Sequence, residues 1–119
     1  LSLGTLMLTQ LLREHGYSID YFTDLPEAEL IRFIADEEPA AVFVSCSNPP
    51  HLPEAYSLLR ALRDSFPDLF ILGGGSALAQ NNEQSLRAGA SYVATALAEA
   101  REHFLAQMKR PRKKAVARV

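Results

Sequence analysis

The sequence has a single cysteine, Cys46, and no long apolar run. One cysteine excludes an internal disulfide, which is consistent with a reducing cytoplasm. Without a run of roughly 20 apolar residues, the sequence predicts no membrane-spanning helix. Asp and Glu number 14 against 12 Lys and Arg, so the chain as a whole gives no reason to expect a polyanionic partner.

The sequence begins with leucine rather than methionine, and it lacks the charged start and apolar stretch of a signal peptide. We interpret its 119 residues as one domain and a piece of a longer protein. Domains commonly contain on the order of 100 to 150 residues, enough to bury a hydrophobic core. We expect a cytoplasmic location.

Apolar residues recur at helical spacing in some segments and follow one another directly in others. Residues 41–44 are consecutive apolar residues, which is typical of a parallel strand covered on both faces. Prolines and glycines mark where helices begin or end. The sequence predicts helices at residues 4–15, 26–38, 53–66, 83–88 and 96–108, and strands at residues 17–22, 40–45, 69–72 and 92–94.

Helices and strands alternate strictly in this prediction, which favours a parallel sheet with helices on both faces. The predicted fold class is therefore doubly wound α/β, with residues 1–108 as the domain. Residues 109–119 open with a dense run of Lys, Arg and Pro. Such a segment is too charged to pack, so we predict a basic flexible tail there and do not expect it to contact DNA.

Three consecutive glycines, Gly73 to Gly75, follow the strand predicted at residues 69–72. Glycines allow the backbone to turn sharply or to approach a ligand closely. No Gly-Lys-Ser/Thr follows them and the spacing fails the dinucleotide pattern, which disfavours a nucleotide loop. Ser45 ends the preceding strand where a receiver domain would need an aspartate. No spacing of Ser, His and carboxylates suggests a hydrolase, and we expect no catalysis by this domain.

Taken together, these positions resemble the cobalamin (vitamin B12) binding domain over about residues 1–104. The resemblance implies a flavodoxin-like sheet of order 2-1-3-4-5. The stretches at residues 11–17 and 50–53 look most like the C-terminal domain of MerR-type transcription regulators that respond to light and B12. The resemblance rests on Gly4, Met7, Leu11-Leu12, Gly16, Pro26, Ser45, Gly73-Gly74 and Gly89-Ala90.

In that family, the histidine of an Asp-x-His-x-x-Gly signature replaces the cofactor's own dimethylbenzimidazole base on cobalt. The displaced nucleotide tail threads between the sheet and its helices, beside a Ser-x-Leu motif and a glycine pair. The candidate cofactor-binding residues that the resemblance implies are Gly4, Ser45, Ser47, Gly73, Gly74 and Gly75. Ser47 stands where the motif has leucine.

Leu1 stands three residues before Gly4, at the position of the family's histidine, and it has no lone pair to offer a metal. Any bound cobalamin should therefore keep its own base, have a bare lower face, or take another ligand. His51 is the candidate substitute metal ligand, because it follows two prolines at the sheet edge where open α/β sheets bind ligands. A solvated loop histidine is the simpler interpretation of His51, and a small buried residue that of Cys46.

In the family the first strand is central and precedes the signature loop, whereas this sequence begins in that loop. The strands predicted at residues 17–22 and 40–45 would then face each other across a gap with unpaired backbone groups, which is costly when buried. We expect a strand upstream in a longer parent, or one supplied by a neighbouring chain, to fill the gap.

The function predicted is that of a cobalamin-binding-like sensory or regulatory domain of a bacterial transcription regulator. The expected partners are cobalamin, an upstream helical bundle or DNA-binding domain, and a further copy in a homo-oligomer, with no membrane. Two alternatives remain open. One is a cobalamin-carrying domain of a methyltransferase or mutase, and the other is a degenerate fold used only for protein interaction.

Overall fold

A computed structural model describes residues 18–22, 26–39, 41–95, 99, 102–103, 105–106 and 114–118. Its helices are α2 (Glu27–Glu37), α3 (Leu52–Ser65), α4 (Ser76–Gln80) and α5 (Asn82–Ala88), with a short 3-10 turn, η1 (Pro49–His51). Its strands are β1 (Ser18–Phe22), β2 (Ala41–Ser45), β3 (Phe70–Gly74), β4 (Tyr92–Val93) and β5 (Lys114–Arg118). The helix expected at residues 4–15 lies outside the described residues. Of the described helices, none is long and apolar enough to cross a membrane.

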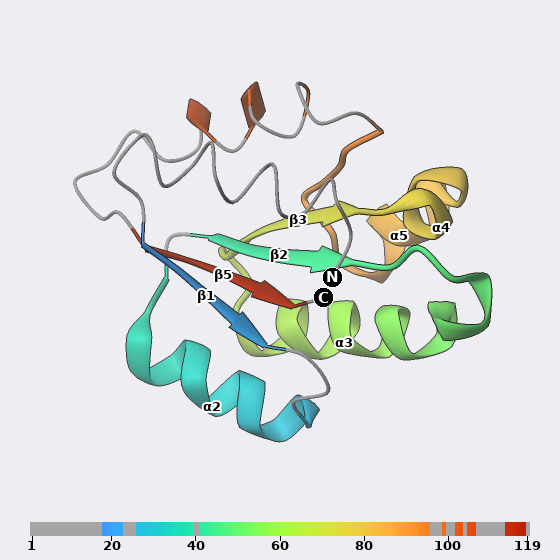
Figure 1. Ribbon diagram of the computed structural model, residues 1–119. Helices are drawn as coiled ribbons and strands as arrows, with labels where there is room; N and C mark the ends of the chain where they lie inside the picture. The colour runs from blue at the N-terminus through green and yellow to red at the C-terminus, as the bar shows by residue number, and fades with distance from the viewer. Residues whose placement is uncertain are drawn as a thin grey trace.

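The five strands form one parallel sheet in the order β1-β5-β2-β3-β4. Figure 1 shows α2 and α3 side by side on one face of this sheet. The alternation of parallel strands and helices confirms the predicted α/β class. With β5 in the second position, the spatial arrangement is that of a flavodoxin-like sheet, whose order is 2-1-3-4-5.

β5 corrects two sequence predictions. Residues 114–118 were expected in a flexible tail, but they lie between β1 and β2 and pair with both, Ala115 aligning with Ile19 and with Ala41. Val116 is fully buried. The gap expected between the two strands is thus closed by the same chain rather than by an upstream segment or a neighbour. Backbone pairing on both sides satisfies amide and carbonyl groups of β5 that would be costly to bury unpaired. This gain outweighs the cost of the charged residues, Lys114 and Arg118, at the two ends of the strand.

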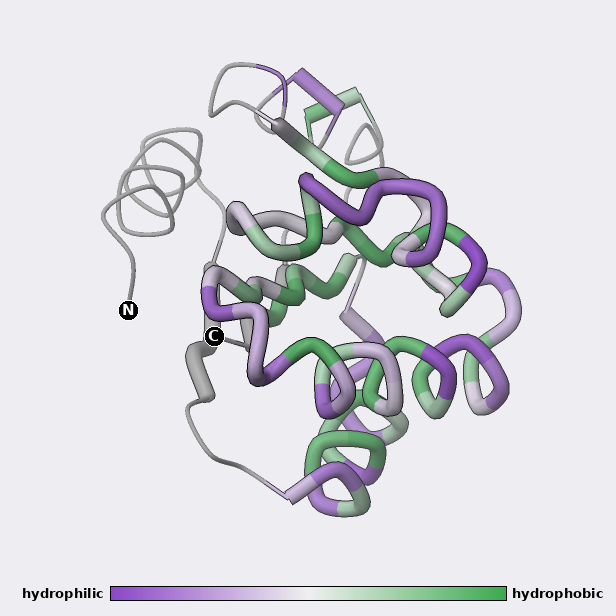
Figure 2. Tube along the Cα trace, turned by 90° about the vertical axis from the view of Figure 1, so that its right-hand side faces the viewer, coloured by the Kyte–Doolittle hydropathy of each residue, from purple (hydrophilic) through white to green (hydrophobic). Residues whose placement is uncertain are grey.

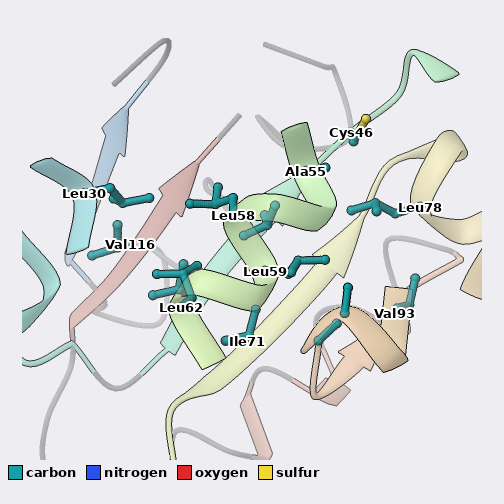
Figure 3. Packing of buried hydrophobic residues seen from close by; sticks show 14 of the residues in the cluster. Leu30, Cys46, Ala55, Leu58, Leu59, Leu62, Ile71, Leu78, Val93 and Val116 are labelled. Atoms are coloured by element: carbon teal, nitrogen blue, oxygen red, sulfur yellow. The ribbon is translucent and has the colours of Figure 1, made fainter. Parts of the chain in front are cut away.

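The hydrophobic core fills the space between the sheet and α2 and α3. α3 presents Ala55, Leu58, Leu59 and Leu62 inward at helical spacing. Figure 3 shows Val116 of β5 beside Leu30 of α2 and on the same side of the sheet as Ile71. In Figure 2 the helical segments alternate between hydrophilic and hydrophobic residues, as expected for helices with one buried side.

Arg63 donates several hydrogen bonds at the edge of the sheet where the strands begin. Its Nε donates to the Gly89 carbonyl at 3.0 Å, and Nη1 donates to the carbonyls of Pro67 at 2.9 Å and Leu69 at 2.7 Å. Its Nη2 donates to Ser91 Oγ at 2.8 Å. The guanidinium therefore ties the end of α3 to the segments that enter β3 and β4, at the edge opposite the candidate site.

Candidate functional site

Ser45 and Gly74 end the two neighbouring strands β2 and β3, and their Cα atoms are register partners. Because the strands are parallel, their carboxyl ends lie at one edge of the sheet, and open α/β sheets bind ligands at this edge. Ser45 is half-buried. The structure thus brings together the serine and one glycine of the predicted site.

The two glycines of the predicted pair face opposite sides of the sheet, since successive residues of a strand alternate between faces. Gly73 is the partner of Val44, which belongs to the core on the α3 side. A Cβ added to Gly73 would meet side chains at 3.5 to 3.7 Å, which is ordinary packing distance. Gly74 therefore lies on the same face as Ser45, whereas Gly73 belongs to the core. Both glycines are part of β3, whereas the sequence predicted that this strand ends at residue 72.

Phe43 lies on the face of Ser45 and Gly74, two residues before Ser45. A Cβ built on Gly74 would stand 2.8 Å from Cζ and 3.0 Å from Cε2 of the Phe43 ring. The ring therefore occupies the space beside Gly74 where a side chain would otherwise extend. Phe43 is itself buried, with 7% of its surface exposed. Phe43 was not among the residues predicted for the site, although the alternation of a strand places residues 43 and 45 on one face.

Gly75 follows β3 and packs directly against the backbone of Cys46. Its φ of 88° and ψ of 152° fall in a region open to glycine almost alone. A Cβ there would stand 2.5 Å from the Cys46 carbonyl oxygen. Gly75 is thus required by this close approach of two backbone segments.

Hydrogen bonds join the segments after β2 and β3. The Cys46 amide donates to the Gly74 carbonyl at 3.0 Å, and the Cys46 carbonyl accepts from the amides of Ala77 at 3.1 Å and Leu78 at 3.3 Å. Ser76 Oγ donates to the Ser47 carbonyl at 3.1 Å. Ser47 thus contributes its backbone to this junction, and its exposed side chain remains a predicted contact.

The Cys46 thiol is buried and donates to the Asn48 carbonyl at 3.4 Å. Burial raises the pKa of this thiol, and the negative charge of Glu54 raises it further. The net effect is an elevated pKa, so the reactive thiolate is disfavoured near neutral pH. Cys46 therefore acts as a small core residue, in agreement with the simpler interpretation.

His51 is exposed and ends η1, directly before α3, and its amide donates to the Asn48 carbonyl at 2.9 Å. Within the described residues, no group of three or more His, Cys, Asp or Glu could hold a metal ion. Ligation of cobalt by His51 stays a prediction. Gly4 and Leu1, the other residues of the predicted site, lie outside the described residues.

A polar cluster stands at the carboxyl end of β4, on the same edge of the sheet. The Tyr92 hydroxyl donates to Glu99 Oε1, and Thr95 Oγ1 donates to Glu99 Oε2 at 2.8 Å. The His103 ring stacks on the Tyr92 ring with 3.6 Å between centroids. These contacts attach helical residues near the end of the chain to β4, and they satisfy the Glu99 carboxylate locally.

The parallel sheet, its open carboxyl edge and the small residues at the ends of β2 and β3 define a ligand-binding domain of the doubly wound α/β class. The sequence profile of the B12 binding domain family matches residues 1–107. The chain belongs to this family. A search of curated proteins finds no match.

The Phe43 ring beside Gly74 limits how the nucleotide tail of a cobalamin would fit at this edge. Ser45 and Gly74 provide the small residues that a passing nucleotide tail needs, but the Phe43 ring fills the space that Gly74 leaves open. The joined segments after β2 and β3 further restrict the edge. These residues, as arranged, do not fit a tail threaded past Gly74.

Proposed function

We propose that this domain binds a corrinoid at the carboxyl edge of its sheet and serves a sensory or regulatory role without catalysis of its own. The observation that carries this proposal is the carboxyl edge of the parallel sheet, where half-buried Ser45 ends β2 beside the end of β3. Membership of the B12 binding domain family supports the ligand class.

The regulatory role rests on the loss of the family's ligating histidine. Alkyl transfer centred on cobalt usually relies on that ligand in this family, and Leu1 cannot replace it. A carrier domain of a methyltransferase or mutase is therefore the weaker alternative. We propose a bacterial transcription regulator as the parent, with a helical bundle or DNA-binding domain and a second copy of the chain as partners.

The test is retention of a corrinoid by the full chain. The protein is mixed with hydroxocobalamin, free ligand is removed by gel filtration, and the visible spectrum is recorded. We expect a retained chromophore in a stoichiometric amount. A colourless protein would refute corrinoid binding and leave the interaction-only alternative.

A pair of serine variants shows whether retention depends on the proposed edge. Ser45→Leu adds bulk at the carboxyl edge of the sheet and should reduce retention at least tenfold. Ser65→Leu is the matched control, because Ser65 is exposed at the end of α3, where the strands begin, and it should retain the ligand as the wild type does. Circular dichroism confirms that both variants are folded. Equal retention by the two variants would exclude this edge as the site.

The same spectrum tests His51. Coordination of cobalt by its imidazole would shift the visible bands, and the shift would vanish in His51→Ala. The packing of Phe43 instead favours a spectrum that is unchanged in His51→Ala.

A further inference from the structure

Phe43 lies on the same face of the sheet as Ser45 and obstructs that face beside Gly74. Phe43, Ser45 and Gly74 share this face, because paired residues of parallel strands point to the same side. Ring carbons of Phe43 lie 2.8 and 3.0 Å from the position that a Cβ of Gly74 would take. A chain of ligand atoms crossing Gly74 on this face would need that same space.

Displacing the ring is expensive because Phe43 is a buried residue. Only 7% of its surface is exposed. Closely packed interiors leave few voids into which a displaced ring can move. The ring is therefore part of the packed sheet face.

The route around the end of the strands is also restricted, and here by backbone. The Cys46 carbonyl faces Gly75 so closely that a Cβ would stand 2.5 Å from its oxygen, and the same carbonyl accepts the amides of Ala77 and Leu78. Opening this junction would break backbone hydrogen bonds and would expose polar groups that are satisfied in the closed arrangement.

We infer that this domain recognises a corrinoid by its ring and peripheral groups, without a nucleotide tail lying across Gly74. This inference rests on the proposed function and specifies the form of its ligand. Corrinoids with and without the nucleotide tail should bind with similar affinity. A bound cobalamin should keep its own base on cobalt.

The experiment compares hydroxocobalamin with aquocobinamide, which has the same corrin ring and lacks the nucleotide base. Equilibrium dialysis of the full chain against each should give dissociation constants within about threefold of one another. The spectrum of bound hydroxocobalamin should keep its base-coordinated form and should be unchanged in His51→Ala. Binding of cobalamin more than tenfold tighter than cobinamide, or a base-displaced spectrum, would overturn the inference while leaving corrinoid binding intact. Binding of neither would refute the proposed function itself.

Variants of Phe43 test whether its ring is what keeps a nucleotide tail from lying across Gly74. Phe43→Ala should open the path beside Gly74 and raise the preference for hydroxocobalamin over cobinamide at least fivefold. Phe70→Ala is the matched control, since Phe70 lies on the same face at the other end of β3 and should leave the ratio unchanged. A ratio of affinities is insensitive to a general loss of stability. Phe43→Leu, which keeps an apolar core residue, should shift the ratio in the same direction, and an unchanged ratio in both Phe43 variants would contradict the role of the ring.

Discussion

Substituting alanine for each of the three consecutive glycines in turn should give three different changes in stability. At Gly73 the new Cβ finds side chains at 3.5 to 3.7 Å and no left-handed backbone, so it fits. Alanine also reduces the entropy of the unfolded chain, by about 0.4 to 1 kcal/mol where the native conformation allows it. We therefore expect Gly73→Ala to be neutral or to raise the free energy of unfolding by up to about 1 kcal/mol.

Gly74→Ala places a Cβ 2.8 Å from the Phe43 ring, which must shift within a packed face. Overpacking of this kind typically costs about 1 to 3 kcal/mol. Gly75→Ala should lower the free energy of unfolding more than Gly74→Ala does, because the Cβ meets backbone atoms of Cys46 at 2.5 to 2.9 Å and φ is 88°. Backbone strain alone is of order 1 to 3 kcal/mol there, so the total loss should exceed about 3 kcal/mol.

Urea unfolding followed by circular dichroism measures all three, with stability falling in the order Gly73→Ala, Gly74→Ala, Gly75→Ala. A double-mutant cycle then isolates the contact with the ring. In a Phe43→Leu background, Gly74→Ala should lose most of its cost, while Gly75→Ala should keep its own. A different order, or an equal cost of Gly74→Ala in both backgrounds, would refute the packing of Phe43 on Gly74.

Three further predictions concern Arg63, Val116 and Cys46. Arg63→Met should lower the free energy of unfolding by about 2 to 3 kcal/mol in urea unfolding, because the carbonyl and hydroxyl partners of Arg63 lose a charged donor. Arg60→Met is the control at an exposed position on the same helix, and it should change that free energy by less than about 0.5 kcal/mol. Val116→Ala should cost about 2 kcal/mol in urea unfolding, since Val116 is fully buried, and no change would show that residues 114–118 are not part of the sheet. The Cys46 thiol has a raised pKa, so its neutral form stabilises the fold below roughly pH 8.5, the ordinary pKa of cysteine, and this contribution is lost as the pH rises above that value. Unfolding at pH 7 and pH 10 should show a smaller pH-dependent loss in Cys46→Ala than in the wild type, and an equal loss in both would contradict burial of the thiol.

Local pattern was sufficient to predict the centre of the fold. The apolar run of β2 and the inward face of α3 are strong signals, and the prediction placed α3 at residues 53–66 against Leu52–Ser65 in the structure. Ser45 and Gly74 were candidates through the family resemblance, and their pairing at one edge is shown by the register of β2 and β3. These features depend on short segments whose sequence and environment agree.

The features that the sequence analysis missed depend on contacts between distant segments. β5 has only three consecutive apolar residues between charged ones, and its place becomes evident only when β1 and β2 are seen to need a partner. α4 is five residues long, too short for a periodic signal. The obstruction by Phe43 required the register between β2 and β3, because it concerns which residue lies opposite which.

The position of β5 also affects how the chain reaches its folded state. β1 is hydrogen-bonded within the sheet to β5, so segments at nearly opposite ends of the sequence must meet before β1 joins β2 and β3. Contacts so far apart in sequence slow folding, because the entropy of closing a long loop is lost before they form. We expect β2, α3 and β3 to assemble first and β1 to join late. In stopped-flow refolding, Leu62→Ala should therefore slow folding, whereas Val116→Ala should mainly accelerate unfolding.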